Sequence, residues 1–224
     1  MITKLYSDPA VHYSHRVRIA LEIKDVAYES INVNSSSSSS AVTERLLEIN
    51  PTGRFPCLID DGVQLDDRSV ILEYIEERFP HPPLLPVYPK MRAKCRQWTN
   101  QLENDVIPRV NRLMNSKTAE RNRIQARKEV LERLLQIGRM IGSHHYVLGG
   151  ISNGEREHDV FTLADCCLFP ILWRLERMGI ELPSTKSGAA LNDYLARLLK
   201  RDSIRLSLSD EERKMRKITA AQVK

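Results

Sequence analysis

The sequence predicts a small α/β domain followed by an all-helical domain. Strand-like runs alternate with helical periodicity up to residue 80, a proline-rich stretch follows, and the later apolar residues keep helical spacing. We expect the α/β domain at 1–80, a proline-rich connector at 81–90, the helical domain at 91–208 and a charged flexible tail at 209–224. The 224 residues, of which 42% are hydrophobic, suffice for packed cores in one large or two small domains.

The first domain begins with a strand, a helix and a second strand. Residues 2–6 alternate as in a strand, and turn residues follow them. From Ser14 to Lys24 the apolar positions recur at helical spacing, and residues 28–33 return to a strand-like run. This pattern predicts a β-α-β unit with parallel strands.

A hairpin and two helices complete the first domain. We expect a mobile loop at the serine run 35–40 and a short helix at 42–49, which Asn50-Pro51-Thr52-Gly53 ends. Asp61-Gly62 between two apolar runs predicts an antiparallel hairpin. The last helix must stop near Arg78, because several prolines follow it. Its apolar stripe is Val70, Ile71, Tyr74 and Ile75.

The second domain shows helical periodicity with no convincing strand. Thr162-Leu163-Ala164-Asp165 predicts a capping box at the start of a nearly all-apolar central helix, which contains Pro170. A further helix is expected at 189–201. Two amphipathic helices precede these, one marked by Cys95, Trp98, Leu102 and Ile107, the other by Ile124, Val130, Leu131, Leu134, Ile137 and Ile141.

The net charge of +5 is unevenly distributed. Residues 1–80 contain 8 basic and 13 acidic residues, a net −5, whereas the rest contains 26 basic and 16 acidic residues, a net +10. A basic second half attracts nucleic acid or an acidic protein surface, or else it reflects ordinary solvated helix faces. Arg92, Lys94, Arg96, Arg109 and Arg112 are among these residues.

The cysteines and the start of the chain indicate a cytoplasmic protein. The four cysteines show no CxxC spacing and no neighbouring histidine pair, so we expect buried thiols and no metal site. The first residues lack a basic segment followed by an apolar core, and no apolar run is long enough to cross a bilayer. The cysteines are Cys57, Cys95, Cys166 and Cys167.

Several motifs carry a resemblance to known families. The β-α-β-α-β-β-α order with Asn50 to Pro56, followed by a helical domain with Thr162 to Asp165, resembles the glutathione S-transferase architecture, with a thioredoxin-like first domain. That resemblance implies a cis peptide bond before Pro56. Four further segments resemble the stringent starvation protein A family within this superfamily: residues 13–18, 77–89, 172–175 and 212–216.

The narrower resemblance implies a regulator and not an enzyme. It implies a homodimer that binds RNA polymerase with its housekeeping sigma factor under starvation or acid stress, reaches nucleic acid only through the polymerase, and needs no cofactor or membrane. It places the required surface on Pro80, His81 and Pro82. Prolines also stiffen this connector, which favours docking or, alternatively, a rigid linker. The expected binding residues are Phe79, Pro80, His81, Pro82, Pro83 and Tyr88.

The residues that a glutathione transferase needs are altered. A transferase places a hydroxyl or thiol after the first strand to stabilise the thiolate, and by resemblance to zeta-type enzymes this position is Val11, with Tyr13 and Ser14 as possible substitutes. The ligand-binding acid and hydroxyl pair reads Asp67-Arg68. We therefore expect no catalytic residue. The vestigial glutathione site comprises Val11, Phe55, Pro56, Asp67 and Arg68.

Two other function classes stay open at this point. A glutathione-dependent transferase is the alternative, and a direct nucleic-acid binder is disfavoured because zinc-finger, helix-turn-helix and aromatic-basic patterns are missing from the sequence. Histidine as a residue type suits acid–base chemistry near neutral pH, but the sequence indicates no carboxylate partner for His12, His15 or His81. We interpret His12 and His15 as surface or helix-start residues.

Overall fold

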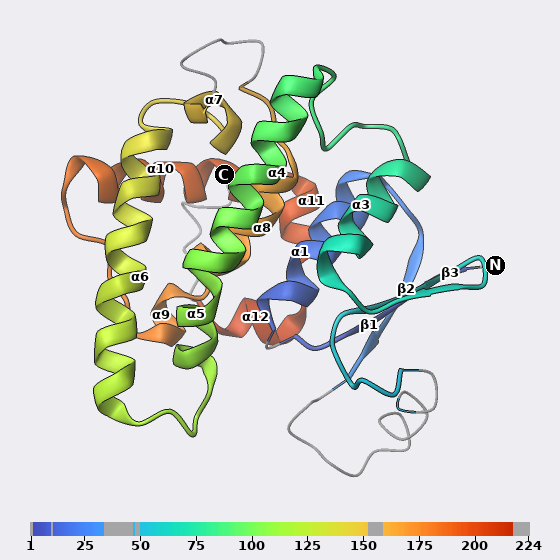
Figure 1. The fold of residues 1–224 in the computed structure, drawn as a ribbon, viewed down its shortest axis with the longest axis horizontal. Helices are drawn as coiled ribbons and strands as arrows, with labels where there is room; N and C mark the ends of the chain where they lie inside the picture. The colour runs from blue at the N-terminus through green and yellow to red at the C-terminus, as the bar shows by residue number, and fades with distance from the viewer. Residues whose placement is uncertain (1, 10, 34–46, 48–49, 152–158, 217–224) are drawn as a thin grey trace. The chain divides into compact units, whose positions relative to one another are not determined.

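The computed structural model describes residues 2–9, 11–33, 47, 50–151 and 159–216 (Figure 1). The chain divides into two compact units. The first unit contains the residues up to Pro83 together with Asp202–Lys214, and the second contains Leu84–Arg201 and the residues from Met215 onward. The chain therefore leaves the first unit at the connector and returns to it near its end.

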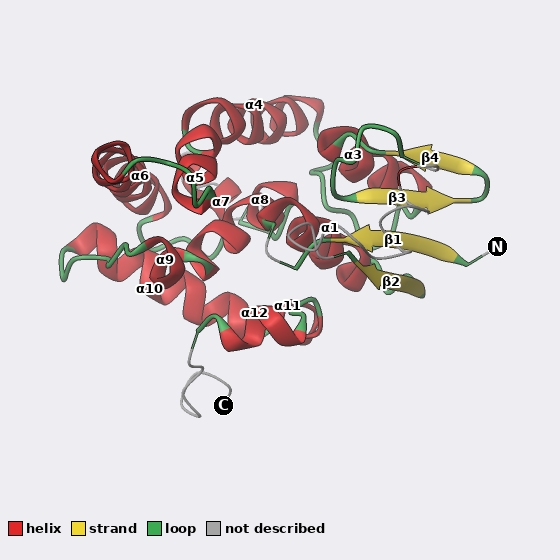
Figure 2. Cartoon of the chain, turned by 90° about the horizontal axis from the view of Figure 1, so that it is seen from below, coloured by secondary structure: helices red, strands yellow, loops and turns green. Residues whose placement is uncertain are grey.

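The first unit is built on a four-stranded mixed sheet. The strands lie in the order β2-β1-β3-β4, as Figure 2 shows. Strand β1 pairs in parallel with β2 and antiparallel with β3, and β3 and β4 are antiparallel. The predicted β-α-β unit and hairpin are both confirmed. The bounds are β1 Thr3–Ser7, β2 Tyr28–Asn32, β3 Cys57–Asp60 and β4 Val63–Leu65.

The turn of the β3–β4 hairpin follows from its sequence. Asp61 and Gly62 have φ angles of 46° and 82°, so both lie in the left-handed region. A two-residue turn with two positive φ angles matches the twist of the flanking strands, and Asp-Gly adopts it at low cost. The hairpin is thereby fixed in register.

Helices α1, His12–Ile23, and α3, Arg68–Arg78, pack against each other in the first unit. Asp67 caps α3 through its side chain, and the helix ends before Pro80 as predicted. The expected loop at 35–40 lies outside the described residues, as does nearly all of the expected helix at 42–49.

The last part of the first unit differs from the sequence-based expectation. The sequence predicts that residues 209–224 form a charged flexible tail, either a frayed helix or disordered; Asp210–Lys214 form helix α12, which follows α11, Asp202–Leu206, and residues 217–224 lie outside the described residues. Glu212 of α12 is fully buried, and α11 packs against α1. The alternation of acids and bases hid this, because a buried ion pair has the same composition as a solvated face.

All the regular secondary structure in the described residues of the second unit is helical. Its central helix α8 is buried along its whole length and contains Pro170. Helix α6 packs against α5 and α10, and α8 packs against α4. None of the described helices combines the length and the apolar character that crossing a membrane requires. The bounds are α4 Pro89–Asp105, α5 Ile107–Met114, α6 Glu120–Ile141, α7 Val147–Ile151, α8 Leu163–Trp173, α9 Leu175–Met178 and α10 Lys186–Leu199.

The capping box at the start of α8 is confirmed. Thr162 and Asp165 satisfy each other's backbone amides, and Asp165 also accepts from the backbone N–H of Val147 at 3.0 Å and from the hydroxyl of Tyr194 at 2.8 Å. Burial raises the pKa of Asp165 to about 6. This carboxyl therefore links three helical segments at the centre of the second unit.

Several predicted details of the helical unit are wrong. Cys95 to Ile107 do not share one helix: α4 ends at Asp105 and α5 begins at Ile107, because Pro108 lacks the amide proton that a continuous helix uses. Ile124 was placed on the apolar stripe of α6, but it is 59% exposed. Helix α4 also begins at Pro89, inside the expected connector, since proline fits the first turn of a helix.

Candidate functional site

The turn after β1 holds the position where the transferase resemblance requires a hydroxyl. Val11 occupies it as the N-cap of α1, with extended backbone torsions and no side-chain capping bond. Its side chain carries no proton that a thiol or thiolate would share. The replacement anticipated from the sequence therefore lies at the start of α1.

Two hydroxyl groups close to this turn serve internal hydrogen bonds. Ser14 is fully buried and accepts from the backbone N–H of Asp8 at 3.1 Å. Ser7, at the end of β1, is also fully buried and accepts from Nη1 of Arg18. Ser14, one of the two substitutes that the sequence left open, is thus a structural hydroxyl.

Tyr13, the other substitute, lies against two arginines. Cζ of Arg68 is 3.7 Å from the centroid of the Tyr13 ring, and Cζ of Arg16 is 5.0 Å from it. Both distances lie within the range of cation–π attraction. Arg68, which stands at the position of the expected ligand-binding hydroxyl, therefore stacks on the ring of Tyr13. Tyr13 itself is only 7% exposed.

The remaining members of the vestigial site have structural roles. Asp67 accepts from the backbone N–H groups of Ser69 and Val70 at 2.8 and 3.0 Å, and the Val70 amide is the main cause of its lowered pKa. The Phe55-Pro56 peptide bond is cis, which confirms the expectation for Pro56. Phe55 packs against a cluster of Tyr6, Val33 and Cys57.

The thiols offer no nucleophile for a redox or transfer reaction. All four cysteines lie in described parts of the chain, are buried and form no disulfide. Burial, reinforced by Asp66, raises the pKa of Cys57 to about 11, and burial raises that of Cys95 to about 12. Both thiols stay protonated at neutral pH. Within the described residues no group of three His, Cys, Asp or Glu side chains is arranged to hold a metal ion.

The proline-rich connector exposes a continuous run of residues. Pro80, His81, Pro82 and Pro83 are all exposed, and the His81-Pro82 peptide bond is cis, a feature that the sequence did not indicate. Phe79, which ends α3, is half-buried beside the guanidinium of Arg78, whose Cζ lies 5.3 Å from the ring centroid.

The next residues of the connector are fixed to the helical unit. Leu84 and Leu85 are buried, and the carbonyl of Leu84 accepts from the backbone N–H of Leu163 at 2.8 Å. Val87 and Tyr88 follow and are 82% and 57% exposed. The buried pair Leu84 and Leu85 thus separates the exposed residues 80–83 from the exposed side chains of Val87 and Tyr88.

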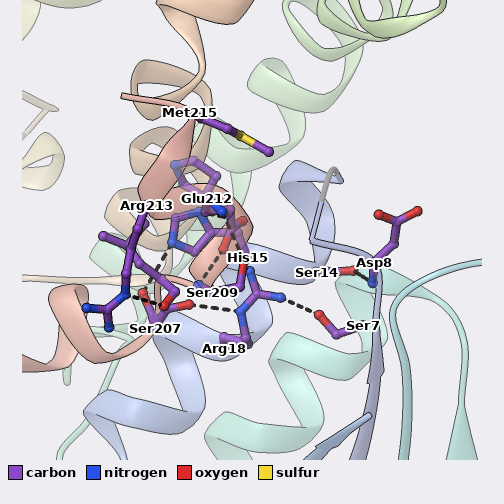
Figure 3. A network of polar contacts seen from close by, with 12 residues as sticks. Ser7, Asp8, Ser14, His15, Arg18, Ser207, Ser209, Glu212, Arg213 and Met215 are labelled. Atoms are coloured by element: carbon purple, nitrogen blue, oxygen red, sulfur yellow. Dashed lines mark hydrogen bonds and ion pairs between the residues drawn. The ribbon is translucent and has the colours of Figure 1, made fainter. Parts of the chain in front are cut away.

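A buried polar network fastens the α11–α12 segment to α1 (Figure 3). Oε1 of Glu212 lies 3.3 Å from Nδ1 of His15, and Oε2 pairs with Nη2 of Arg18. Nε of Arg18 donates to the carbonyl of Ser207 at 2.9 Å, and the backbone N–H of Ser209 donates to Oε2 of Glu212 at 3.0 Å. Each charge in this network is therefore matched, as buried charges require.

His15, Ser207 and Glu212 have the composition of a hydrolase triad, but not its function. Nε2 of His15 is 3.2 Å from Oγ of Ser207, and that hydroxyl donates to the carbonyl of Ile204 at 2.7 Å. Its proton is therefore already committed to the backbone. All three side chains are at most 1% exposed, so no substrate reaches the serine. The chemistry that this arrangement supports is the stabilisation of the fold.

Comparison with known proteins identifies the family. Residues 5–83 match the family model described as the N-terminal domain of glutathione S-transferase. The proteins named stringent starvation protein A homolog in Haemophilus ducreyi and Pasteurella multocida are 35% and 37% identical to this chain over 210 and 207 residues. Each alignment covers 92% of this chain and 90% of the relative. The chain belongs to the stringent starvation protein A family.

This stringent starvation protein A family member shares its fold with enzymes. A Caenorhabditis elegans protein named probable maleylacetoacetate isomerase is 31% identical over 198 residues, covering 86% of this chain and 87% of the relative. A solved ternary complex of BphK, a bacterial glutathione S-transferase, matches with a TM-score of 0.78 and 26% identity, over 92% of this chain and 97% of that chain. The expected fold, a thioredoxin-like domain plus an all-helical domain, is confirmed.

Sequence reasoning missed the partner of His15. Of the two interpretations of His15, the helix-start one is confirmed, because His15 lies in the first turn of α1. The surface one is wrong: His15 is buried against Glu212, a carboxylate nearly two hundred positions later in the chain that the sequence did not indicate. One signal was available: α1 places two arginines among its apolar residues, and buried cations require an anion. The two arginines indicate that an acidic side chain must pair with α1, but they do not indicate which Asp or Glu of the chain it is.

The network predicts a large loss of stability in Glu212→Gln. The substitution removes the carboxylate charge that pairs with the buried guanidinium of Arg18, which costs about 3 kcal/mol of unfolding free energy for a pair of this burial. Urea unfolding of the purified protein measures it. Glu211→Gln is the matched control, since Glu211 is exposed one position earlier and should stay within about 0.5 kcal/mol. Equal stability of the two variants would contradict this role of Glu212.

Proposed function

We propose that this chain is a non-catalytic transcription regulator that binds RNA polymerase holoenzyme with its housekeeping sigma factor in the cytoplasm during starvation or acid stress. The observation that carries the proposal is the connector, where Pro80, His81, Pro82 and Pro83 are exposed in sequence while Leu84 and Leu85 hold the next residues in place. The names of the family's relatives support a role in the starvation response.

The connector has the physical properties of a docking surface. Proline fixes its own φ angle, so a partner that binds Pro80, Pro82 and Pro83 orders few new torsions and loses little of its binding free energy to entropy. The half-buried Phe79 and the exposed His81 and Tyr88 supply the aromatic and hydrogen-bonding groups that are common in binding hot spots. We therefore favour docking over a linker that only joins the two units.

The altered thiol site supports a non-catalytic role. Val11 has no hydroxyl, Ser14 is buried in a structural hydrogen bond, and Arg68 covers the ring of Tyr13. These residues leave no group placed to stabilise a glutathione thiolate next to the cis bond at Pro56. A glutathione-dependent transferase, the function named for some relatives, remains the rival.

Self-association completes the proposal. A hollow of about 210 Å³ lies between α4 and α6, with Trp98, Leu102, Ile137 and Met140 at its apolar floor and Asp105 and Arg133 among its polar residues. An apolar floor with both charge signs suits a self-complementary contact, as in a two-fold dimer. We propose that two copies of the chain pair through this face.

Replacing Pro80, His81 and Pro82 together by alanine should abolish binding to purified RNA polymerase holoenzyme while leaving the dimer mass and melting temperature nearly unchanged. The reason is that all three residues are exposed. Co-purification on tagged polymerase measures binding. Pro51→Ala, which changes an exposed proline outside the connector, is the control and should bind normally. Full binding by the triple variant would rule out the connector as the docking site.

The purified chain should not conjugate glutathione to chlorodinitrobenzene above the uncatalysed rate, because Val11, at the position of the expected hydroxyl, has no group that activates the thiol. Spectrophotometry of the conjugate tests this directly. In Val11→Ser/Arg68→Ser the missing hydroxyls are restored, and this variant should be retained on immobilised glutathione where the native chain is not. Turnover by the native chain would support the transferase reading instead.

Ile137→Asp should convert the proposed dimer into a monomer, since it places a charge on the apolar floor of the α4–α6 hollow. Light scattering after gel filtration gives the mass. The control is Ile124→Asp, an exposed isoleucine on the same helix, which should leave the mass unchanged. An unchanged mass for Ile137→Asp would place the contact elsewhere.

A further inference from the structure

The helical hairpin of α5 and α6 carries a concentration of positive charge that the proposed docking role of the connector does not use. Between residues 107 and 128 there are seven basic residues and one acidic residue, Glu120. The two helices pack against each other and are joined by a short turn (Figure 1). The basic residues are Arg109, Arg112, Lys117, Arg121, Arg123, Arg127 and Lys128.

Three of these arginines hold the hairpin together. Nε of Arg109 lies 2.5 Å from Oε2 of Glu129 and thereby links α5 to α6. Nη1 of Arg123 donates to the carbonyl of Asn115 in the turn at 3.4 Å. Nε of Arg127 donates to the carbonyl of Met178 at 3.0 Å, which fixes α6 to α9. The hairpin is therefore a rigid support for its other charges.

The other four basic residues are exposed: Arg112, Lys117, Arg121 and Lys128. None of them forms an ion pair with a carboxylate in the described part of the chain. Lys117 is held at the turn because its backbone N–H donates to Oδ1 of Asn115 at 2.9 Å. The four side chains are thus exposed and outside any ion pair of the described residues, and the backbone that carries them is held in place.

Two of the exposed charges share one helix face with an apolar side chain. Arg121, Ile124 and Lys128 are three and four residues apart on α6, a spacing that places them on one helix face. Ile124 is 59% exposed between the two cations. The charge of Arg112 on α5 helps to lower the pKa of Glu129 on α6, after the hydrogen bonds from Gln125 and Arg109, so Arg112 lies near α6.

We propose that this basic hairpin surface, formed by Arg112, Lys117, Arg121, Ile124 and Lys128, binds an acidic amphipathic helical segment of a partner protein. From Arg121 to Lys128 the surface spans about 10 Å, the rise of two helical turns. Acidic side chains of the partner pair with the cations, and an apolar side chain packs on Ile124.

The composition of the surface favours protein over nucleic acid. Residues 107–128 contain no Phe, Tyr or Trp on which a base would stack. The basic stretch also ends within one turn, at Glu129 and Glu132, whereas electrostatic tracking of a nucleic acid needs a longer positive path.

The test uses three fluorescent probes on the full chain. They are a short helix-forming peptide with Glu and Leu at helical spacing, the same peptide with Gln in place of Glu, and a short duplex DNA. Binding is followed by anisotropy at low and physiological salt. The test variant is Arg112→Glu/Arg121→Glu/Lys128→Glu. The control variant, Arg139→Glu/Lys186→Glu/Lys200→Glu, changes the net charge equally at other exposed positions.

The native chain and the control variant should bind the Glu-Leu peptide similarly, and the test variant should bind it about tenfold or more weakly. Ile124→Gln should weaken the peptide without affecting DNA. If the reversed triple variant does not fold, the same three residues changed to Gln give the comparison. Equal loss in the control variant, equal binding of the Gln peptide, or DNA binding as tight as peptide binding and lost in the test variant would each overturn the proposal.

Discussion

The carboxylate of Glu212 has no exposed surface, and the organisation of the first unit follows from the need to pair it. Its two oxygens face His15 and Arg18 of α1, and Arg18 in turn binds Ser7 of β1 and the backbone at Ser207. One side chain therefore ties a segment from the end of the chain to the first strand and first helix. Charges buried this deeply tolerate little displacement, because each would lose its partner in a medium of low polarity.

Other polar side chains at the start of α1 and α3 are likewise engaged in internal contacts. The hydroxyls nearest to β1 bind Arg18 and the backbone of Asp8, and the carboxylate of Asp67 caps α3. Arg68 stacks on Tyr13. These polar groups therefore make contacts within the protein, whereas the prolines and the imidazole of the connector are exposed.

Local patterns in the sequence predicted most of the fold and only part of the site. The local signals are the spacing of apolar residues, the positions of the prolines, the Asp61-Gly62 turn and the Thr162 capping box. The helices, strands and turn that these signals predict are present. The cis peptide bond before Pro56 was expected from the family resemblance and not from a local pattern. The pairing of His15 with Glu212 and the stacking of Arg68 on Tyr13 join residues distant in sequence, so no local pattern contains them. Pro108 is a local signal for the end of α4 before α5, but the sequence analysis did not use it.

The central claim is that the connector itself touches the polymerase. A photo-crosslinking amino acid at position 81, in place of His81, gives the most direct measurement when the chain is mixed with purified RNA polymerase holoenzyme and irradiated. We predict a covalent adduct with a polymerase or sigma subunit from position 81 and none from position 200, an exposed site at the end of α10. An adduct from position 200 with none from position 81 would contradict the account.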